Sequence, residues 1–274
     1  MAYIQTNDDV ALYIKDWGTG SPVILIHGWP LSADSWDLIA IRLVEAGYHV
    51  ISYDRRGFGR SDQPWQGYDY DTLADDLKAV IRQKNLENVS LVGFSMGGGE
   101  IARYLSRHQG EKIKQVALLS SVVPFLIQTP DHQDGVPKHV FDQMIDGLIK
   151  DRPHFYSKFF KEFYGVGVLS HPVSQEFLDA STQVALQASL KATLDSVVAF
   201  SQTDFRPDLA SFNVPTLVIH GTADKTVPID VSARAVKQAL PHATLIEYEG
   251  EPHGIFATQT DRVVEDLLQF LSSH

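Results

Sequence analysis

Residues 91–100 read LVGFSMGGGE and join two different sequence patterns. The apolar run that ends here has the character of a buried strand, and the residues that follow have the pattern of an amphipathic helix. A sharp turn from strand to helix crowds the neighbours of Ser95, so glycine is needed at positions 93 and 97. The pattern predicts a serine hydroxyl exposed at the head of the helix, where the positive dipole end favours an anion.

Strand and helix patterns alternate along most of the chain, which is typical of an α/β fold with a mostly parallel sheet and helices on both faces. We expect eight strands, at residues 2–6, 10–16, 22–27, 49–53, 89–94, 114–120, 215–220 and 243–248. We expect helices at residues 36–46, 71–84, 97–108, 231–239 and 260–272. Only a short turn separates the first two strands, so they should pair antiparallel.

This alternation stops between about Pro124 and Pro207, where helical periodicity continues without a credible buried strand. We therefore expect a core formed by residues 1–123 and 208–274, with a helical cap, residues 124–207, inserted after the sixth strand. The cap is unusually aromatic, and some of its rings should line a cavity between cap and core. The aromatic residues are Phe125, Phe141, Phe155, Phe159, Phe160, Phe163 and Tyr164.

Composition narrows the classes of partner and the compartment. The 274 residues include 34 acidic and 23 basic side chains, a formal net charge of −11 that argues against nucleic acid or an anionic membrane as partner. There is no cysteine, which excludes disulfides, thiolate nucleophiles and cysteine-bound metals. No signal-peptide pattern and no apolar run of about 18 residues is present, so we expect a soluble cytoplasmic protein without a membrane partner.

A serine hydroxyl is a weak nucleophile unless a base accepts its proton and an acid orients that base. For a serine in this kind of turn, the acid and then the histidine follow along the chain. His253 follows the last strand, and Asp224 lies four residues past the end of the strand before it. We predict Ser95, Asp224 and His253 as a catalytic triad.

Other candidates fit these positions less well. His27 and His220 end strands and are interpreted as structural, and Asp54 with its neighbouring arginines is interpreted as a cluster that fixes loops. His242, Asp204 and Asp208 precede the relevant strands, and His274 is the last residue.

An oxyanion hole needs two N–H groups directed at the developing negative charge. The residue after the nucleophile, Met96, supplies one. The other comes from the loop after the first parallel strand, HGWPLS at residues 27–32. Gly28 permits the tight turn and Pro30 has no N–H, so Trp29 is the expected second donor.

Six motifs together resemble the cofactor-free bacterial haloperoxidases (non-heme chloroperoxidases) and the related aryl esterases. They are HGWPLS at 27–32, YDRRGFGRSDQPWQGYDYDT at 53–72, LVGFSMGGGE at 91–100, TDFRPDL at 203–209, VPTLVIHGTADKTVP at 214–228 and PHG at 252–254. The similarity extends through essentially the whole chain and implies an α/β-hydrolase fold with a helical cap. Ser95, Asp224 and His253 fall on the family's triad positions, and Trp29 and Met96 fall on its oxyanion donors.

The resemblance also implies an activity. Members hydrolyse small activated esters, and some perhydrolyse them: hydrogen peroxide replaces water, and the released peracid oxidises halide. The expected partners are thus a small ester or carboxylic acid and hydrogen peroxide, with no cofactor and no metal. Relatives are often oligomers, which leaves a homo-oligomer open. We expect substrate contacts from Trp29, Pro30, Phe125, Met144, Phe159, Val227 and Ile255.

The proline at position 30 suggests a hypothesis about peroxide. We expect the Trp29–Pro30 peptide bond to be cis, since a proline in a tight functional turn is the usual place for one. If the Trp29 carbonyl oxygen faces the space above Ser95, it accepts a hydrogen bond from attacking peroxide and favours perhydrolysis.

Several alternatives share the fold. Epoxide hydrolases and haloalkane dehalogenases need a carboxylate where this chain has Ser95, so their chemistry is excluded. Lactonases, lactamases, thioesterases and carbon–carbon bond hydrolases keep the serine and remain open. A ligand receptor with a slow triad is an alternative from another class, and an unchanged ligand response after Ser95→Ala would favour it.

Overall fold

A central sheet of eight strands organises the chain in the computed structural model, which describes residues 2–273. The strand order is β1-β2-β4-β3-β5-β6-β7-β8. The strands are β1 Tyr3–Gln5, β2 Ala11–Trp17, β3 Ser21–Ile26, β4 Tyr48–Tyr53, β5 Val89–Phe94, β6 Ile113–Leu119, β7 Thr216–Gly221 and β8 Thr244–Tyr248. The pairs β1–β2 and β2–β4 are antiparallel and the others are parallel, which confirms the predicted sheet.

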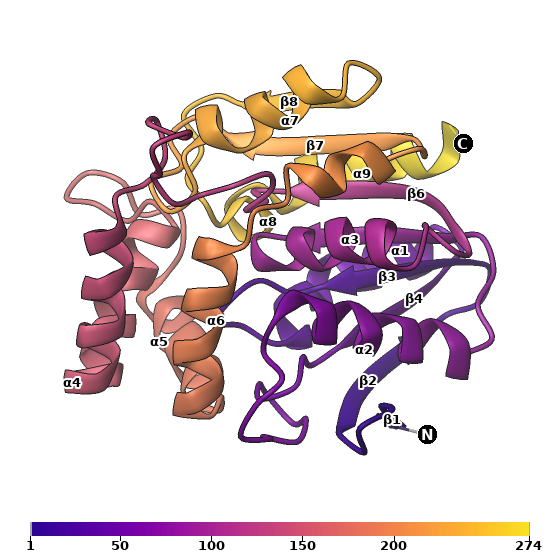
Figure 1. The fold of residues 1–274 in the computed structure, drawn as a ribbon, viewed down its shortest axis with the longest axis horizontal. Coiled ribbons are helices and arrows are strands. Elements are labelled where there is room, and N and C mark those ends of the chain that lie inside the picture. Colours follow the sequence, from indigo (N-terminus) through magenta and orange to yellow (C-terminus); the bar gives the residue numbers. More distant parts are fainter. Residues whose placement is uncertain (1, 274) are drawn as a thin grey trace.

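Helices cover both faces of the sheet. The crossovers place α2 (Tyr70–Gln83) and α3 (Met96–Arg107) against one face and α1 (Asp37–Glu45) and α9 (Thr260–Ser273) against the other (Figure 1). Because the sheet is covered on both sides, all six residues of β5 are buried. The remaining core elements are α7 Ala233–Ala239, α8 Ile255–Thr258 and three short 3₁₀ helices at Ala33–Trp36, Pro207–Ser211 and Ile229–Val231.

The segment between β6 and β7 forms three helices, α4 (Lys138–Phe163), α5 (Gln175–Leu186) and α6 (Leu190–Gln202). They gather beyond the carboxyl ends of the parallel strands, at the left of the view (Figure 1). This confirms a helical region after the sixth strand. The division into a core and a separate cap at residues 124 and 207 stays a prediction.

Helix α4 contains a kink. The backbone of Asp151 is extended (φ −162°, ψ 87°), two residues before Pro153. Pro153 therefore falls in the first turn of the second half of the helix, where a residue without an N–H is tolerated. The Asp151 carboxylate accepts the backbone N–H of His154 (3.0 Å), which caps the second half of the helix.

Polar side chains fix the loops that follow β3 and β4. Asp54 accepts the backbone N–H groups of Ala33 and Arg60, each at 2.8 Å, so one buried carboxylate ties the two loops together. This geometry confirms the interpretation of Asp54 as part of a loop-fixing cluster.

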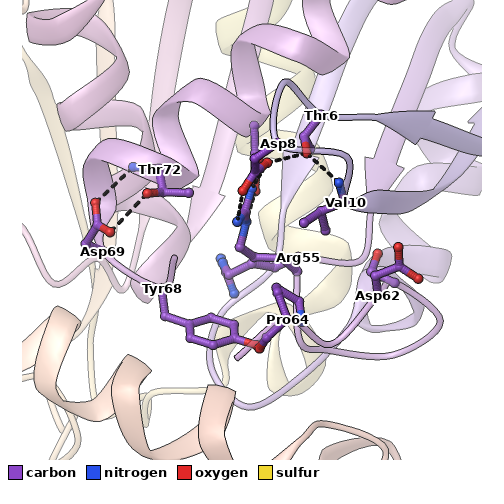
Figure 2. A network of polar contacts seen from close by, with 12 residues as sticks. Thr6, Asp8, Val10, Arg55, Asp62, Pro64, Tyr68, Asp69 and Thr72 are labelled. Carbon is purple, nitrogen blue, oxygen red and sulfur yellow. Dashed lines mark hydrogen bonds and ion pairs between the residues drawn. The ribbon is translucent and has the colours of Figure 1, made fainter. Parts of the chain in front are cut away.

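The loop after β4 is also held by contacts with the β1–β2 turn and with α2. Figure 2 shows that Thr6 donates to Asp8 (2.6 Å) in the turn between β1 and β2, and that Asp69 accepts from Thr72 at the start of α2. Arg56 joins these parts, because it donates to Asp8 (2.8 Å) and to Asp76 of α2 (2.7 Å). The loops at the carboxyl ends of β3 and β4 are thus firmly positioned.

The helices between residues 2 and 273 give no membrane span: none of them combines the length and the apolar character that crossing a bilayer requires.

Candidate active site

Ser95 lies in a sharp turn between β5 and α3. Its backbone has φ 53° and ψ −116°, a conformation that residues with a side chain rarely adopt. A Cβ atom on Gly93 would lie 2.6 Å from the carbonyl oxygen of Gly97, and one on Gly97 would lie 2.4 Å from that of Ile26. Both glycines are therefore required by close backbone approach, as the opening motif indicates.

Three loops bring Ser95, His253 and Asp224 into one hydrogen-bonded chain. The Ser95 hydroxyl donates to His253 Nε2 at 2.9 Å, and His253 Nδ1–H donates to Asp224 Oδ2 at 2.6 Å. All three residues are at least nine-tenths buried, with Ser95 and His253 reaching the wall of a cavity. The arrangement is that of a nucleophile, a general base and an orienting acid.

The Asp224 carboxylate is surrounded by donors. Its Oδ1 accepts the backbone N–H groups of Thr226 (2.9 Å) and Val227 (2.8 Å). Burial alone would raise the pKa of Asp224, but attraction to His253 and hydrogen bonds from His220 and His253 hold it well below the ordinary carboxyl value. The acid is therefore an anion throughout the neutral range.

The imidazole of His253 is held in place by rings and backbone contacts. It packs against Phe94 and Phe163, with ring centroids 5.0 and 4.8 Å away. Ser120 donates its hydroxyl to the His253 carbonyl at 3.0 Å. The next residue, Gly254, donates its N–H to the Phe163 carbonyl at 2.8 Å, so helix α4 of the inserted segment also supports the base.

The loop after β3 lies directly against the serine. A Cβ atom on Gly28 would be 2.9 Å from the Cβ of Ser95. The Leu31 N–H donates to the Gly28 carbonyl at 3.0 Å, which closes a tight turn around Pro30. The Trp29–Pro30 peptide bond is cis, which confirms that part of the hypothesis.

The two expected oxyanion donors are both unpaired. Among the hydrogen bonds of residues 2–273, none uses the backbone N–H of Trp29 or of Met96. Met96 is the first residue of α3, where helix N–H groups have no partner within the helix. The indole of Trp29 donates instead to the carbonyl of Thr193 in α6 (3.2 Å).

A buried ion pair supports the loop after β3 through the carbonyl of His27. Arg55 and Glu100 form a salt bridge in which neither side chain is exposed to solvent. Arg55 also donates to the carbonyl of His27 at 2.7 Å, and Tyr53 donates to Glu100 at 2.6 Å. His27 accepts the backbone N–H of Arg55 at 3.0 Å, in agreement with its structural interpretation.

A cavity of about 760 Å³ opens above Ser95 between the core and helices α4 and α6. Its apolar wall consists of Trp29, Val122, Val136, Val140, Phe141, Met144, Phe155, Phe159, Phe200 and Val227. Charged side chains also line it, namely Lys150, Asp151, Lys158, Glu162 and Lys225, and all five are exposed. An apolar interior with few polar groups suits a small organic substrate.

The predicted substrate contacts divide into two groups. Trp29, Met144, Phe159 and Val227 line the cavity, whereas Pro30, Phe125 and Ile255 do not. Phe125 instead packs between His132, with ring centroids 5.3 Å apart, and the guanidinium of Arg206, 4.9 Å from its ring. Phe160, Phe163 and Tyr164 are buried and do not line the cavity: Phe163 and Tyr164 pack against Phe256, and Phe160 packs against other rings of α4.

Sequence reasoning missed part of the site. Val122, Val136, Val140 and Phe200 line the cavity, but nothing in the local sequence distinguishes them from ordinary core residues. It also assigned His220 a purely structural role, although its Nε2 lies 3.1 Å from Asp224 Oδ2. In the described part of the chain, no group of three or more His, Asp or Glu side chains is arranged to hold a metal ion.

Ser95 lies in a strained turn at the end of a mostly parallel sheet, and His253 and Asp224 follow it in one hydrogen-bonded chain. This arrangement defines a serine hydrolase of the α/β-hydrolase fold. Comparison with known proteins agrees, since residues 21–260 match the α/β hydrolase fold family. The chain belongs to the non-heme chloroperoxidase and esterase family of α/β hydrolases, and it is an enzyme of that family.

Three relatives illustrate this membership. The chain is 41% identical to the non-heme chloroperoxidase of Kitasatospora aureofaciens, over 99% of this chain and 100% of that one. It is 38% identical to the bifunctional esterase/perhydrolase of Acinetobacter calcoaceticus, over 100% of both chains. The crystal structure of a bromoperoxidase from Bacillus anthracis is 46% identical and superposes with a TM-score of 0.96, covering 99% of both chains.

Proposed function

We propose that this enzyme hydrolyses small carboxylic esters, aryl esters among them, through an acyl-enzyme on Ser95, and that hydrogen peroxide replaces water in a second reaction that yields a peracid. The observation that carries the proposal is the hydrogen-bonded chain from Ser95 through His253 to Asp224, which opens into a largely apolar cavity. The esterase/perhydrolase and chloroperoxidase relatives support both reactions.

Acylation begins when the Ser95 oxygen attacks the ester carbonyl while His253 Nε2 accepts its proton. The negative charge that develops on the carbonyl oxygen is held by the N–H groups of Trp29 and Met96. The imidazolium of His253, stabilised by Asp224, then protonates the departing alcohol or phenol. The acyl group remains bound to Ser95 as an ester.

Deacylation uses the same groups in reverse. His253 removes a proton from water or hydrogen peroxide, and the resulting nucleophile attacks the acyl carbon. Collapse of the tetrahedral intermediate returns the proton to Ser95 and releases a carboxylic acid or a peracid. The peracid then oxidises halide to hypohalite in solution and is itself reduced to the carboxylic acid.

The Trp29 carbonyl supplies the preference for peroxide. Water and hydrogen peroxide each keep one O–H after giving a proton to His253, but in peroxide that O–H lies on the distal oxygen, one atom beyond the attacking oxygen. A carbonyl oxygen directed at the space above Ser95 accepts a hydrogen bond from that O–H and stabilises the perhydrolytic transition state. The contact of the Gly28 turn with Ser95 supports this part of the proposal.

The substrate's acyl or aryl group lies in the apolar part of the cavity, against Trp29, Met144, Phe159 and Val227. The reaction takes place in the cytoplasm, in line with a chain that contains no cysteine.

The last part of the proposal is that the enzyme assembles into a homo-oligomer. Light scattering coupled to size-exclusion chromatography tests it.

Two assays test the proposed function. Purified protein should release p-nitrophenol from p-nitrophenyl acetate, and it should halogenate monochlorodimedone in acetate buffer with peroxide and bromide. Ser95→Ala should abolish both activities, whereas Ser157→Ala, at an exposed serine of α4, should retain both. Halogenation that persists in Ser95→Ala would contradict an acyl-enzyme route.

A further inference from the structure

His220 is a fully buried histidine next to the proposed triad. It lies near the end of β7, four residues before Asp224, and its side chain has no exposed surface. Its Nε2 is 2.9 Å from the carbonyl oxygen of Val227 and 3.1 Å from Oδ2 of Asp224. The same Oδ2 accepts the Nδ1–H of His253, so two imidazoles approach one carboxylate oxygen.

The surroundings of His220 determine its protonation. Both neighbours of Nε2 are acceptors, so this nitrogen must carry a hydrogen. Its Nδ1 is buried, and no hydrogen-bond partner for it exists among residues 2–273. An N–H at Nδ1 would be buried without an acceptor, and both the Nδ1–H tautomer and the imidazolium would carry one. The ring is therefore neutral, with its hydrogen on Nε2.

We propose that His220 is a positioning residue of the catalytic centre: its neutral Nε2–H holds the Asp224 carboxylate in place and partly neutralises it, and so sets the pH range in which His253 acts as a base. This inference rests on the proposed function, because it requires the triad to be the working site. His220 touches neither substrate nor Ser95 and acts only through Asp224.

The direction of the effect follows from charge. Asp224 stabilises the protonated form of His253 by attraction, and every donor on the carboxylate weakens that attraction. Besides His220, the donors are the backbone N–H groups of Thr226 and Val227. Removing the His220 N–H leaves more negative charge facing His253, so the imidazolium persists to higher pH. The acid limb of the pH–rate profile should then move to higher pH.

Other charged groups near His220 do not replace this donor. Glu247 of β8 is its partner in the strand register, but that carboxylate is held by Arg234, with distances of 2.8 and 2.6 Å. Lys225, next to Asp224 in the chain, is exposed and has no ion-pair partner in the described structure. Both remain unchanged when His220 is substituted, so they do not alter the comparison between variants.

The test compares His220→Met, which removes the donor at similar volume, with His220→Gln, whose amide nitrogen can occupy the place of Nε2. The measured quantity is kcat/KM for p-nitrophenyl acetate as a function of pH. We expect His220→Met to lose about tenfold in kcat/KM and to shift the acid limb upward by about 0.5–1 pH unit. His220→Gln should bring the limb back toward the wild-type position. His242→Met, at an exposed histidine before β8, is the matched control.

The outcomes separate the two proposals. Loss of activity in Ser95→Ala with an unshifted limb in His220→Met would overturn the role of His220 and leave the proposed function intact. A limb displaced equally in His220→Met and His220→Gln would also overturn it. If His220→Met does not fold, the ¹⁵N chemical shifts of the His220 ring in the wild-type protein show which tautomer is present. The His220 signals are assigned as those that are missing in His220→Gln. An Nε2–H tautomer supports the inference, and an Nδ1–H tautomer contradicts it.

Discussion

Gly28 and Ser95 lie close together, although they follow different strands of the sheet, β3 and β5. Their contact is so close that a Cβ atom on Gly28 would lie 2.9 Å from the Cβ of Ser95 and 2.6 Å from the ring of Phe94. The loop that carries Trp29, a proposed oxyanion donor, therefore lies directly against Ser95, and this close approach requires a residue without a side chain at position 28.

Gly28→Ala should reduce activity far more than stability. The added methyl group pushes the loop away from Ser95 and moves the N–H of Trp29 off the developing oxyanion. Loss of one such donor costs on the order of 10²–10³ in kcat. Steady-state kinetics with p-nitrophenyl acetate measures it, and Gly167→Ala is the control, because its Cβ would meet no atom within 4 Å. An unchanged kcat in Gly28→Ala would contradict the placement of the donor.

Glu100→Gln should destabilise the protein strongly. The substitution leaves the Arg55 charge buried without its counterion, a situation that typically costs about 3–5 kcal/mol. Asp142→Asn breaks an exposed pair with Lys138 on α4 and should cost about 0.5 kcal/mol or less. Urea unfolding followed by circular dichroism measures both. Equal effects of the two variants would show that the buried pair has no special weight.

Much of this architecture could be predicted from the sequence because its signals are local. Aliphatic runs and helical periodicity identify all eight strands and the core helices α1, α2, α3, α7 and α9, but not the four-residue helix α8. The glycines around Ser95 specify the turn that exposes it. The proposed catalytic residues Ser95, Asp224 and His253 follow strands β5, β7 and β8 in that order. Asp224 and His253 could thus be selected from many carboxylates and histidines before their positions were known.

The wall of the cavity could not be predicted in the same way. Phe125 and Phe141 are both aromatic residues of the inserted segment, yet only Phe141 faces the cavity, because the packing of α4 and α6 decides which rings turn inward. The contact between His220 and Asp224 could not be predicted from the sequence either. It arises because the backbone N–H groups of Thr226 and Val227 fold the loop after β7 around the carboxylate.

Asp224→Asn should lower kcat by about 10³–10⁴, because a neutral amide does not stabilise the His253 imidazolium and disturbs its tautomer. Steady-state kinetics at a pH where the wild type is fully active measures the loss. Asp230→Asn, at an exposed carboxylate paired with Arg234, is the control and should retain activity. A loss of less than tenfold in Asp224→Asn would argue that another acid orients His253.

The same variant should change how stability depends on pH. The folded protein lowers the pKa of Asp224 below its unfolded value of about 4, so the carboxylate stabilises the fold above that pH. This contribution is lost as the pH falls through the lower, folded pKa. The stability difference between wild type and Asp224→Asn should be constant from about pH 5 to 8 and shrink on further acidification. Urea midpoints measured from pH 8 down to below the unfolded pKa of about 4 test this expectation, and a difference that grows at low pH would contradict the sign.

Met144→Trp should narrow the substrate range. Met144 lies on the cavity wall, and an indole there takes space that a longer acyl chain needs. We expect kcat/KM for p-nitrophenyl hexanoate to fall about tenfold more than that for the acetate. Ile149→Trp, at an exposed position of the same helix, should change neither value. An equal loss for both esters would place the acyl group elsewhere.

Pro30→Leu should shift the balance between the two proposed reactions toward hydrolysis. Proline fixes its own φ and lacks an N–H, so leucine adds a donor and conformational freedom directly after Trp29. The Trp29 carbonyl then no longer holds the orientation that the attacking peroxide requires, whereas attack by water does not depend on it. Loss of one hydrogen bond in the transition state corresponds to about a five- to tenfold fall in the ratio of perhydrolysis to hydrolysis. Peracetic acid formation and p-nitrophenyl acetate hydrolysis give that ratio, and Pro241→Leu, at an exposed proline before β8, is the control. If both activities of Pro30→Leu fall by the same factor, the proline serves the oxyanion loop as a whole and does not select the nucleophile.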